Sequence, residues 1–499
     1  MSFDEKPSGS IHLGITGYQF FCVMAASISI LNFGWNLVVI NQPEDIIIRC
    51  VDGPKHNILG LPSCLPTSDV VWGLAVGSYA IGNLIGAFAC TWFSNKYGRR
   101  FVLIHSNTLA LASALLLALS VDIPMFIIAR VVSGIAQGAA NGTFSTYVVE
   151  ITTPKARNSL GCVLELAVNV GMTIVSLCSL GLMKPPLWRV LFSLTSALSL
   201  LSMAGLYWCV ESPRWLAMKN RSEEAHRVLG RLRKGADITD EFEQLIVEVS
   251  PDSDKCSEDT DTVSVMDIIL GRTPDNLRHQ LLVSVMGMAL QQASGICAIA
   301  FFSTSLFNAI SPPLQTAGDT RKPTVAQYLS VGIAAVAVLF SVGGMFLAHH
   351  VGRRGLMFLS YGLMCLFSVL MCIGDVLEIH ALAITSVFIF FGAYYLGAGP
   401  LTWVVPAEIT PTYAIAAMMA ITSSIGYLGD FTISLIFKPI YNAIHGYCFL
   451  VFAAANAISM VYIFFFLPET KDRTVSDLVR THSVGIHNVL RAKYKVEKC

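Results

Sequence analysis

The sequence has few charged residues for its length, and they are balanced in sign. Charged side chains make up 13% of the 499 residues, with 33 basic and 33 acidic ones. Soluble proteins carry about a quarter of charged residues, so this composition excludes an ordinary soluble domain. The formal net charge is zero, and proteins that bind nucleic acids carry basic patches, so we expect no nucleic-acid partner.

The patterns of common enzyme and metal sites are also missing. The 13 cysteines include no CxxC pair, and those within apolar segments stand alone. Isolated cysteines of this kind usually pack as small apolar side chains. No nucleophile and base set, metal-ligand spacing or phosphate-binding loop is present. We therefore expect neither an enzyme nor a bound metal or cofactor.

Long apolar runs are what the sequence does contain, since 54% of its residues are hydrophobic. A membrane-spanning helix needs roughly 20 apolar residues. About twelve runs are long enough, at 15–40, 68–92, 101–120, 124–149, 160–183, 188–209, 281–310, 326–348, 355–374, 379–405, 414–437 and 445–467. The first is too long for the apolar part of a cleavable signal peptide, so we interpret it as a transmembrane helix.

The runs divide into two groups of six around a polar gap. We expect an all-α membrane protein with two six-helix bundles and a small helical segment between them. The predicted domains are an N-terminal tail, a first bundle, a linker, a second bundle and a C-terminal tail, at 1–14, 15–210, 211–278, 279–467 and 468–499. Within the linker we expect a helix capped by Ser222 and a second helix from Thr239.

A short pattern occurs once in each half of the chain. Gly98-Arg99-Arg100 follows an apolar segment, and Glu150-Ile151-Thr152 follows two segments later. Gly352-Arg353-Arg354 and Glu408-Ile409-Thr410 repeat this order. Duplicated hydrophobic halves with basic loops at matching places are typical of secondary transporters. The copies differ seven residues after the Glu, where the first has Arg157 and the second Ile415.

The distribution of basic residues predicts the orientation. With both termini in the cytosol, the short inner and outer loops hold equal numbers of Lys and Arg. The linker and the C-terminal tail add further basic residues, which favours cytosolic termini. The plasma membrane is the expected location, with a vacuolar or other internal membrane as the alternative. Cys50 and Cys64 both fall in the first outer loop, where they are candidates for a disulfide.

Ionisable residues within apolar segments are functional hypotheses, because charge at membrane depth is costly. Arg130, Glu165 and Asp430 are the candidates. The two carboxylates either line a central cavity or form hydrogen bonds of purely structural role with a hydroxyl or backbone group. Either is also a candidate proton site.

Charged residues nearer the inner ends of the segments suggest ionic latches. The first half offers Arg99, Arg100, Glu150 and Arg157, and the second offers Arg353, Arg354 and Glu408. Such pairs can hold one closed state of a two-state carrier and break in another. The alternative is plain anchoring of the loops.

Adjacent amides in the seventh segment predict a polyol site. Gln291 and Gln292 need hydrogen-bond partners at membrane depth, and Gly295 loosens the helix just beyond them. Aromatic residues suit stacking on a sugar ring, although packing is their commoner role; the candidates are Phe301, Phe302, Trp403 and Tyr427. The stretch 397–400 interrupts the tenth segment and predicts a hinge.

Seven motifs in order resemble those of the sugar porters of the major facilitator superfamily, which include animal facilitative glucose transporters and fungal relatives. The similar stretches are Phe33 to Asn36, Asn95 to Arg100, Arg130 with Gly134, Glu150 to Arg157, Glu211 to Leu216, Gln291 to Ile296 and Leu467 to Lys471. The resemblance implies two six-helix bundles, alternating access and a hexose-like substrate between the bundles. It also implies that Gln291, Gln292 and Trp403 contact substrate, and it adds Glu211 and Arg214 to the latch residues.

Departures from the family pattern fall on substrate positions. The family's fifth-helix Gln corresponds to Glu165, and its tenth-helix Glu to Tyr395. Four positions at which the family has Asn correspond to Cys297, about Ala337, Gly426 and Asp430. A position at which the family has Trp corresponds to Tyr427. In the second latch, His349 and Ile415 replace an acid and an Arg. Sites built to bond a hydroxyl discriminate strongly, so these changes argue against specificity for ordinary glucose. The candidate substrate-binding residues are Gln291, Gln292, Cys297, Trp403, Glu165, Asp430, Tyr395 and Tyr427.

Together these features predict a carrier of a hexose-like sugar or polyol. Similar proton-coupled proteins carry Asp where Asn36 stands, which favours facilitated diffusion. Proton symport through Glu165 or Asp430 is one alternative, and a transporter-like nutrient sensor that binds but barely transports is another. The expected partners are the small solute and the lipid bilayer, and the expected state is a monomer.

Overall fold

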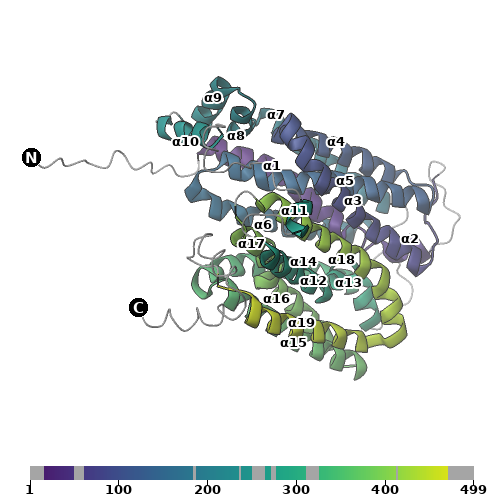
Figure 1. Cartoon of the computed structure of the whole chain (residues 1–499). Coiled ribbons are helices and arrows are strands. Elements are labelled where there is room, and N and C mark those ends of the chain that lie inside the picture. Colours follow the sequence, from purple (N-terminus) through teal and green to yellow (C-terminus); the bar gives the residue numbers. More distant parts are fainter. Residues whose placement is uncertain are drawn as a thin grey trace, which may run out of the picture.

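A computed structural model describes residues 16–49, 61–183, 187–234, 238–249, 265–270, 277–310, 325–411 and 414–469, and their regular structure is helical (Figure 1). Among these residues, eleven segments are long and apolar enough to cross a membrane. The last, Ala417–Phe466, has 50 residues and holds two helices, which makes twelve spans in all. The expected all-α fold with twelve membrane helices is confirmed.

The first half of the chain forms six long helices and one short one. These are α1 (Gly17–Val38), α2 (Glu44–Arg49), α3 (Asp69–Tyr97), α4 (Arg99–Ala118), α5 (Ile123–Ile151), α6 (Pro154–Leu182) and α7 (Trp188–Trp208). Glycines let α3 and α5 approach closely. A Cβ atom on Gly82 would overlap the carbonyl oxygen of Val131, and one on Gly134 would overlap that of Tyr79.

The second half repeats this plan with more interruptions. Its elements are α12 (Arg278–Ala293), α13 (Ile296–Ile310), α14 (Val325–Val351), α15 (Arg353–Val376), α16 (His380–Ala393), the π-helical turn η2 (Tyr394–Ala398), α17 (Gly399–Ile409), α18 (Ile415–Ile444), η4 (His445–Tyr447) and α19 (Cys448–Phe466). Gly295 separates α12 from α13 with a φ of +93°, and η2 interrupts the tenth span. The break at Gly295 lies where the sequence predicts it, and η2 begins three residues before the predicted stretch 397–400 and overlaps it.

The two halves lie side by side, with the purple to teal helices of the first half against the green to yellow helices of the second (Figure 1). Helix α3 packs along α18, and α6 packs along α14. A Cβ atom on Gly73 of α3 would lie 2.6 Å from the carbonyl oxygen of Ser434 of α18. The approach of the halves therefore depends on small residues, as it does within the first half.

Short helices lie in the linker, and the first three of them gather at one end of the molecule, which we call the linker side (Figure 1). They are α8 (Pro213–Met218), α9 (Ser222–Leu232), α10 (Thr239–Val249) and α11 (Val265–Leu270). The predicted cap at Ser222 is wrong by one residue, because α9 begins at Ser222 and Arg221 precedes it as N-cap.

The linker helices divide between the halves. The Thr16 hydroxyl donates to the carbonyl of Leu232 at 2.8 Å, and Arg233 of the same region donates to the carbonyl of Ile151 at 3.1 Å. These bonds attach α9 to the first half. Ile268 of α11 instead packs with Met418 of α18 in the second half.

The eleventh span is longer than the sequence predicts. The expected end at residue 437 is wrong, because α18 continues through Lys438 and Pro439 to Ile444. The charge of Lys438 is tolerated there because it pairs with carboxylates of the first half. The exact boundaries of the five predicted domains stay a prediction.

Candidate functional site

Gln291 lies at the end of α12 and is tied to the irregular tenth span. Its side chain is 1% exposed. Its amide nitrogen donates to the carbonyls of Ala398 and Gly399 at 3.2 and 3.1 Å, and to the Tyr394 hydroxyl at 3.0 Å. A π-helical turn shifts the backbone bonding pattern, and such turns are frequent at functional sites. Its Oε1 atom has no hydrogen-bond partner among the described residues.

Gln292, Cys297 and Asp430 form a second contact group beside it. The sulfur of Cys297 lies 2.9 Å from Gln292 Oε1 and 2.8 Å from Asp430 Oδ1, and its single thiol proton is shared between these two acceptors. A Cβ atom on Gly429 would lie 2.5 Å from Cγ of Gln292. The absence of a side chain at this glycine therefore lets α18 carry Asp430 up to α12 and α13.

Glu165 brings a carboxylate from α6 of the first half toward this group. It is partly exposed, and no described residue hydrogen-bonds to it. It lies within electrostatic range of Tyr394 and Tyr395 of η2, and Cys297 is within range of the same two tyrosines. Glu165 therefore faces the second half across the boundary between the halves.

Aromatic residues extend the group along α17 and α18. The rings of Trp403 and Tyr427 are 6.5 Å apart at 51°. Asn141 of α5 donates to the Tyr427 hydroxyl at 3.5 Å from the opposite half. Direct contacts thus join most of the candidate substrate residues in small sets, whereas Glu165 is related to Tyr395 only by electrostatic range. The structure also adds Asn141, which the sequence analysis missed. Their role in binding stays a prediction. A lone Asn in an apolar segment was the available signal.

Phe301 and Phe302 lie outside these contacts. Both are buried, and Phe302 stacks on Phe437 with ring centroids 5.7 Å apart. This is the packing role that the sequence analysis left open for them.

Arg130 is placed inside the first half. Its guanidinium lies 4.5 Å from the ring centre of Tyr79 and donates to the carbonyl of Asn36 at 2.9 Å. Tyr79 is within electrostatic range of Asp430 and Tyr427. Arg130 therefore contacts the site indirectly, through Tyr79.

On the linker side, the two copies of the repeat make ion pairs of unequal quality. Arg99 donates two hydrogen bonds of 2.8 and 2.9 Å to the Glu150 carboxylate, and the side chains are 6% and 7% exposed. Arg353 approaches Glu408 at 3.4 Å, and both side chains are 27% exposed. The side chain of Arg157 lies outside the described part of the structure.

Two further glutamates cap the helices that begin with the repeated Gly-Arg-Arg. Glu211 accepts backbone N–H bonds from Arg99 and Arg100 at 2.8 and 3.1 Å. Glu469 accepts those of Arg353 and Arg354 at 2.9 and 3.2 Å. A carboxylate at a helix N-terminus satisfies unpaired N–H groups and complements the helix dipole.

The sequence analysis missed Glu469, whose signal was its place beside a proline after the last apolar run. Burial raises the pKa of Glu211, and the hydrogen bonds from Ser212, Arg100 and Arg99 oppose that rise.

The two remaining latch candidates lie apart from the ion pairs. Arg100 donates to the carbonyl of Leu206 at 2.8 Å, and Arg214 is exposed on α8.

At the end away from the linker, side chains of both halves bond to one another. Lys438 of α18 pairs with Glu44 of α2 and, at 3.3 Å, with Asp69 of α3. Ser305 of α13 donates to Glu44 at 2.7 Å. We call Glu44, Asp69, Ser305 and Lys438 the opposite-side clasp. Glu44 is 2% exposed, so the clasp closes the boundary between the halves at this end.

Asn41 adds a second set of bonds next to the clasp. Its side-chain amide donates to the Ser303 hydroxyl at 2.5 Å, and its oxygen accepts the backbone N–H of Thr304 at 3.2 Å. These bonds hold α13 against the end of α1. They sit beside Phe302, where α13 departs from helical geometry.

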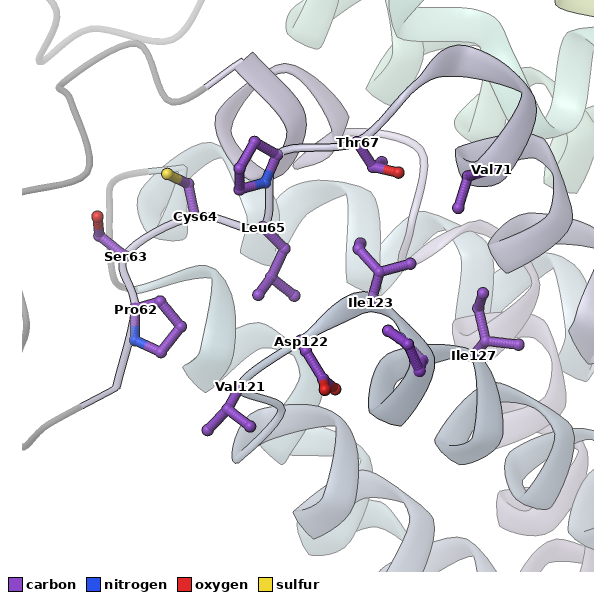
Figure 2. A pocket seen from close by; sticks show the side chains of 12 residues that line it. Pro62, Ser63, Cys64, Leu65, Thr67, Val71, Val121, Asp122, Ile123 and Ile127 are labelled. Carbon is purple, nitrogen blue, oxygen red and sulfur yellow. The ribbon is translucent and has the colours of Figure 1, made fainter.

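A separate cavity of about 580 Å³ lies on the same side but within the first half (Figure 2). Its walls include Leu65, Val71, Asp122 and Ile127, and none of the candidate substrate residues lines it. Cys64 on its rim is disulfide-bonded. Cys50 lies outside the described residues, so the pairing of these two cysteines stays a prediction.

Comparison of the sequence with known proteins identifies its family. The model of the family described as "Sugar (and other) transporter" matches residues 21–481. The chain belongs to this family. Facilitated glucose transporter member 3 of Gallus gallus is 30% identical over 493 residues, which cover 97% of this chain and 96% of that protein. The member 3 protein of Ovis aries is 28% identical, covering 93% of each.

Solved structures of another transporter show the same fold. The xylose transporter XylE from E. coli, in a partially occluded inward open conformation, gives a TM-score of 0.74 at 20% identity, covering 92% of this chain and 100% of that one. XylE bound to 6-bromo-6-deoxy-D-glucose gives 0.73 at 20% identity, covering 92% and 98%. The major facilitator fold predicted from the motifs is therefore confirmed.

Proposed function

We propose that this family member carries a hexose-like sugar or polyol across the membrane by facilitated diffusion. The observation that carries the proposal is the polar group at the boundary of the halves, formed by Gln291, Gln292, Cys297, Asp430 and Glu165. Polar side chains at this depth are costly unless they serve a pathway or site. Relatives named as facilitated glucose transporters support the substrate class.

Alternating access follows from the asymmetry between the two ends. The opposite-side clasp holds the halves together at one end, so the site opens toward the linker side while the clasp is formed. Rocking of one half against the other, with the clasp broken, opens the other end. The latch residues at the linker side, among them Arg99 and Glu150, are proposed to hold one closed state and to break in another; plain anchoring of the loops is the alternative.

We place both termini in the cytosol and the monomeric protein in the plasma membrane, with an internal membrane as the alternative. The basic residues of the linker helices, among them Arg227 and Arg231 of α9, support the orientation because basic segments stay on the cytosolic side.

Uptake by the full chain in liposomes tests the function. The expected result is uptake of at least one member of a labelled panel of hexoses, pentoses and polyols. Gln291→Ala should weaken binding by about ten-fold or more, because a buried hydrogen-bonding group is lost. Gln280→Ala is the matched control, since Gln280 is a buried glutamine on α12 away from the site. Binding without uptake would favour the sensor.

Cys297 offers a second test of the site. A bound solute should slow alkylation of its thiol by a maleimide, because the thiol lies between Gln292 and Asp430. Labelling that persists in Cys297→Ser identifies the contribution of other cysteines. Equal rates with and without a solute that binds would place the site elsewhere.

Proton coupling is the alternative that Glu165 and Asp430 keep open. Facilitated diffusion predicts uptake that is insensitive to a protonophore. Uptake that collapses with the proton gradient in the wild type, and becomes independent of it in Asp430→Asn or Glu165→Gln, would establish symport instead.

A further inference from the structure

The central site has an unbalanced negative charge. Glu165 and Asp430 bring two carboxylates to the boundary between the halves, and neither forms an ion pair with another described residue. Arg130 is turned into the first half, where it bonds to Asn36 and covers Tyr79. Both carboxylates are thus left without a counter-charge from the described residues. Uncompensated charge in a membrane interior is costly, so a positive group should accompany occupancy of the site.

The unpartnered atoms of the site are also acceptors. Glu165 receives no hydrogen bond from a described residue, and Asp430 is bonded by the Cys297 thiol, a weak donor, and by the Gln292 side chain. Gln291 is 1% exposed and uses its amide nitrogen on α17 and η2, which leaves its oxygen without a partner among the described residues. The oxygen of Asn141, whose amide reaches Tyr427, lacks such a partner as well. The buried oxygens of Gln291 and Asn141, together with the two carboxylates, favour a ligand rich in donors.

The acceptor excess arises from particular residues. An amide both donates and accepts, whereas an ionised carboxylate only accepts. The resemblance to sugar porters places Gln and Asn where this chain has Glu165 and Asp430. Both changes remove donors that would read a neutral hydroxyl, and both add negative charge on the same boundary.

We propose that the site selects a sugar or polyol that carries an ammonium group, such as an amino sugar. The ammonium supplies both the missing positive charge and up to three donors to Glu165 and Asp430, while the hydroxyls bond to Gln291 and Asn141. The proposal rests on the proposed function, because it names the substrate class of the same site. A neutral hexose fills the same volume but leaves the carboxylates unpaired.

Binding to the purified full chain in lipid nanodiscs tests the selectivity. The probes are D-glucosamine, D-galactosamine and D-mannosamine, each compared with its neutral parent hexose, and N-acetylglucosamine, which keeps the nitrogen without the charge. At a pH at which the amine is protonated, at least one amino sugar should bind about ten-fold or more tightly than its parent. The preference should disappear at a pH at which the amine is neutral.

Variants then locate the source of the preference. Glu165→Gln and Asp430→Asn should each lower the ratio of amino-sugar to neutral-sugar affinity. Glu223→Gln, which removes one negative charge from exposed α9, should leave the ratio unchanged. If a variant does not fold, the pH dependence of the wild-type preference still decides the question.

The outcomes separate the two claims. Neutral hexoses that bind as tightly as amino sugars would overturn the selectivity and leave the sugar carrier standing. The selectivity also fails if a proton supplies the positive charge, which would appear as proton uptake when a neutral hexose binds. Failure of every probe to bind would overturn both the selectivity and the proposed function.

Discussion

The two copies of the Gly-Arg-Arg repeat share their helix caps but differ in their ion pairs. Glu211 and Glu469 cap their helices with nearly the same bonds. The Arg99–Glu150 pair is buried and doubly bonded, whereas Arg353 and Glu408 meet once, at 3.4 Å, near solvent. A duplicated fold therefore needs the cap in both halves, while the strength of the ion pair is free to differ between them.

The largest expected effect compares the two ion pairs directly. Glu150→Gln leaves a buried guanidinium without its counter-charge and should lower the free energy of unfolding by about 3–5 kcal/mol. Glu408→Gln should lower it by about 1 kcal/mol or less, because the pair is solvent-screened. Chemical unfolding of the purified protein in detergent measures both. Equal losses would mean that burial does not distinguish the copies.

The glycines that begin the two repeats should behave alike. Gly98 and Gly352 have φ angles of +106° and +84°, in a region open mainly to glycine. A Cβ atom on Gly98 would overlap the Glu211 carboxylate, and one on Gly352 would lie 2.7 Å from that of Glu469. Gly98→Ala and Gly352→Ala should each cost about 1–3 kcal/mol. A loss in one half alone would show that the caps are unequal too. Gly181→Ala is the control, because its Cβ would meet no atom within 4 Å.

The smallest effect concerns the protonation of the first cap. Because burial raises the pKa of Glu211 in the folded state, the folded protein binds this proton more tightly than the unfolded chain. Stability from this group is therefore present below the ordinary carboxyl pKa of about 4.3 and declines as the pH rises above it. Glu211→Gln should flatten that decline in thermal unfolding across pH. A variant with an unchanged pH profile would contradict this assignment.

Much of the fold could be predicted because it depends on local chemistry. Apolar run length identified the spans, and Gly295 and 397–400 identified the breaks. The end of α18 could not be predicted, since Lys438 resembles a loop residue until Glu44 and Asp69 are brought to it from the other half. The same reason hid Asn141 and Glu469, whose partners lie far away along the chain.

The site was predictable in its members and less so in its contacts. Gln291, Gln292 and Asp430 stood out as polar residues in apolar runs. That the thiol of Cys297 joins Gln292 to Asp430 follows from the kink at Gly295 and the side-chain space at Gly429. These are features of helix packing, which spacing along one chain does not specify.

Because the linker helices divide between the halves, the distance between α9 and α11 should report the movement of one half relative to the other. Helix α9 is fastened to the first half through Leu232 and Arg233, and α11 rests on the second half through Ile268. Fluorophores attached at exposed Arg227 of α9 and exposed Ile269 of α11 would report the angle between the halves by energy transfer. A full transport cycle could then be followed one molecule at a time without placing any label inside the membrane.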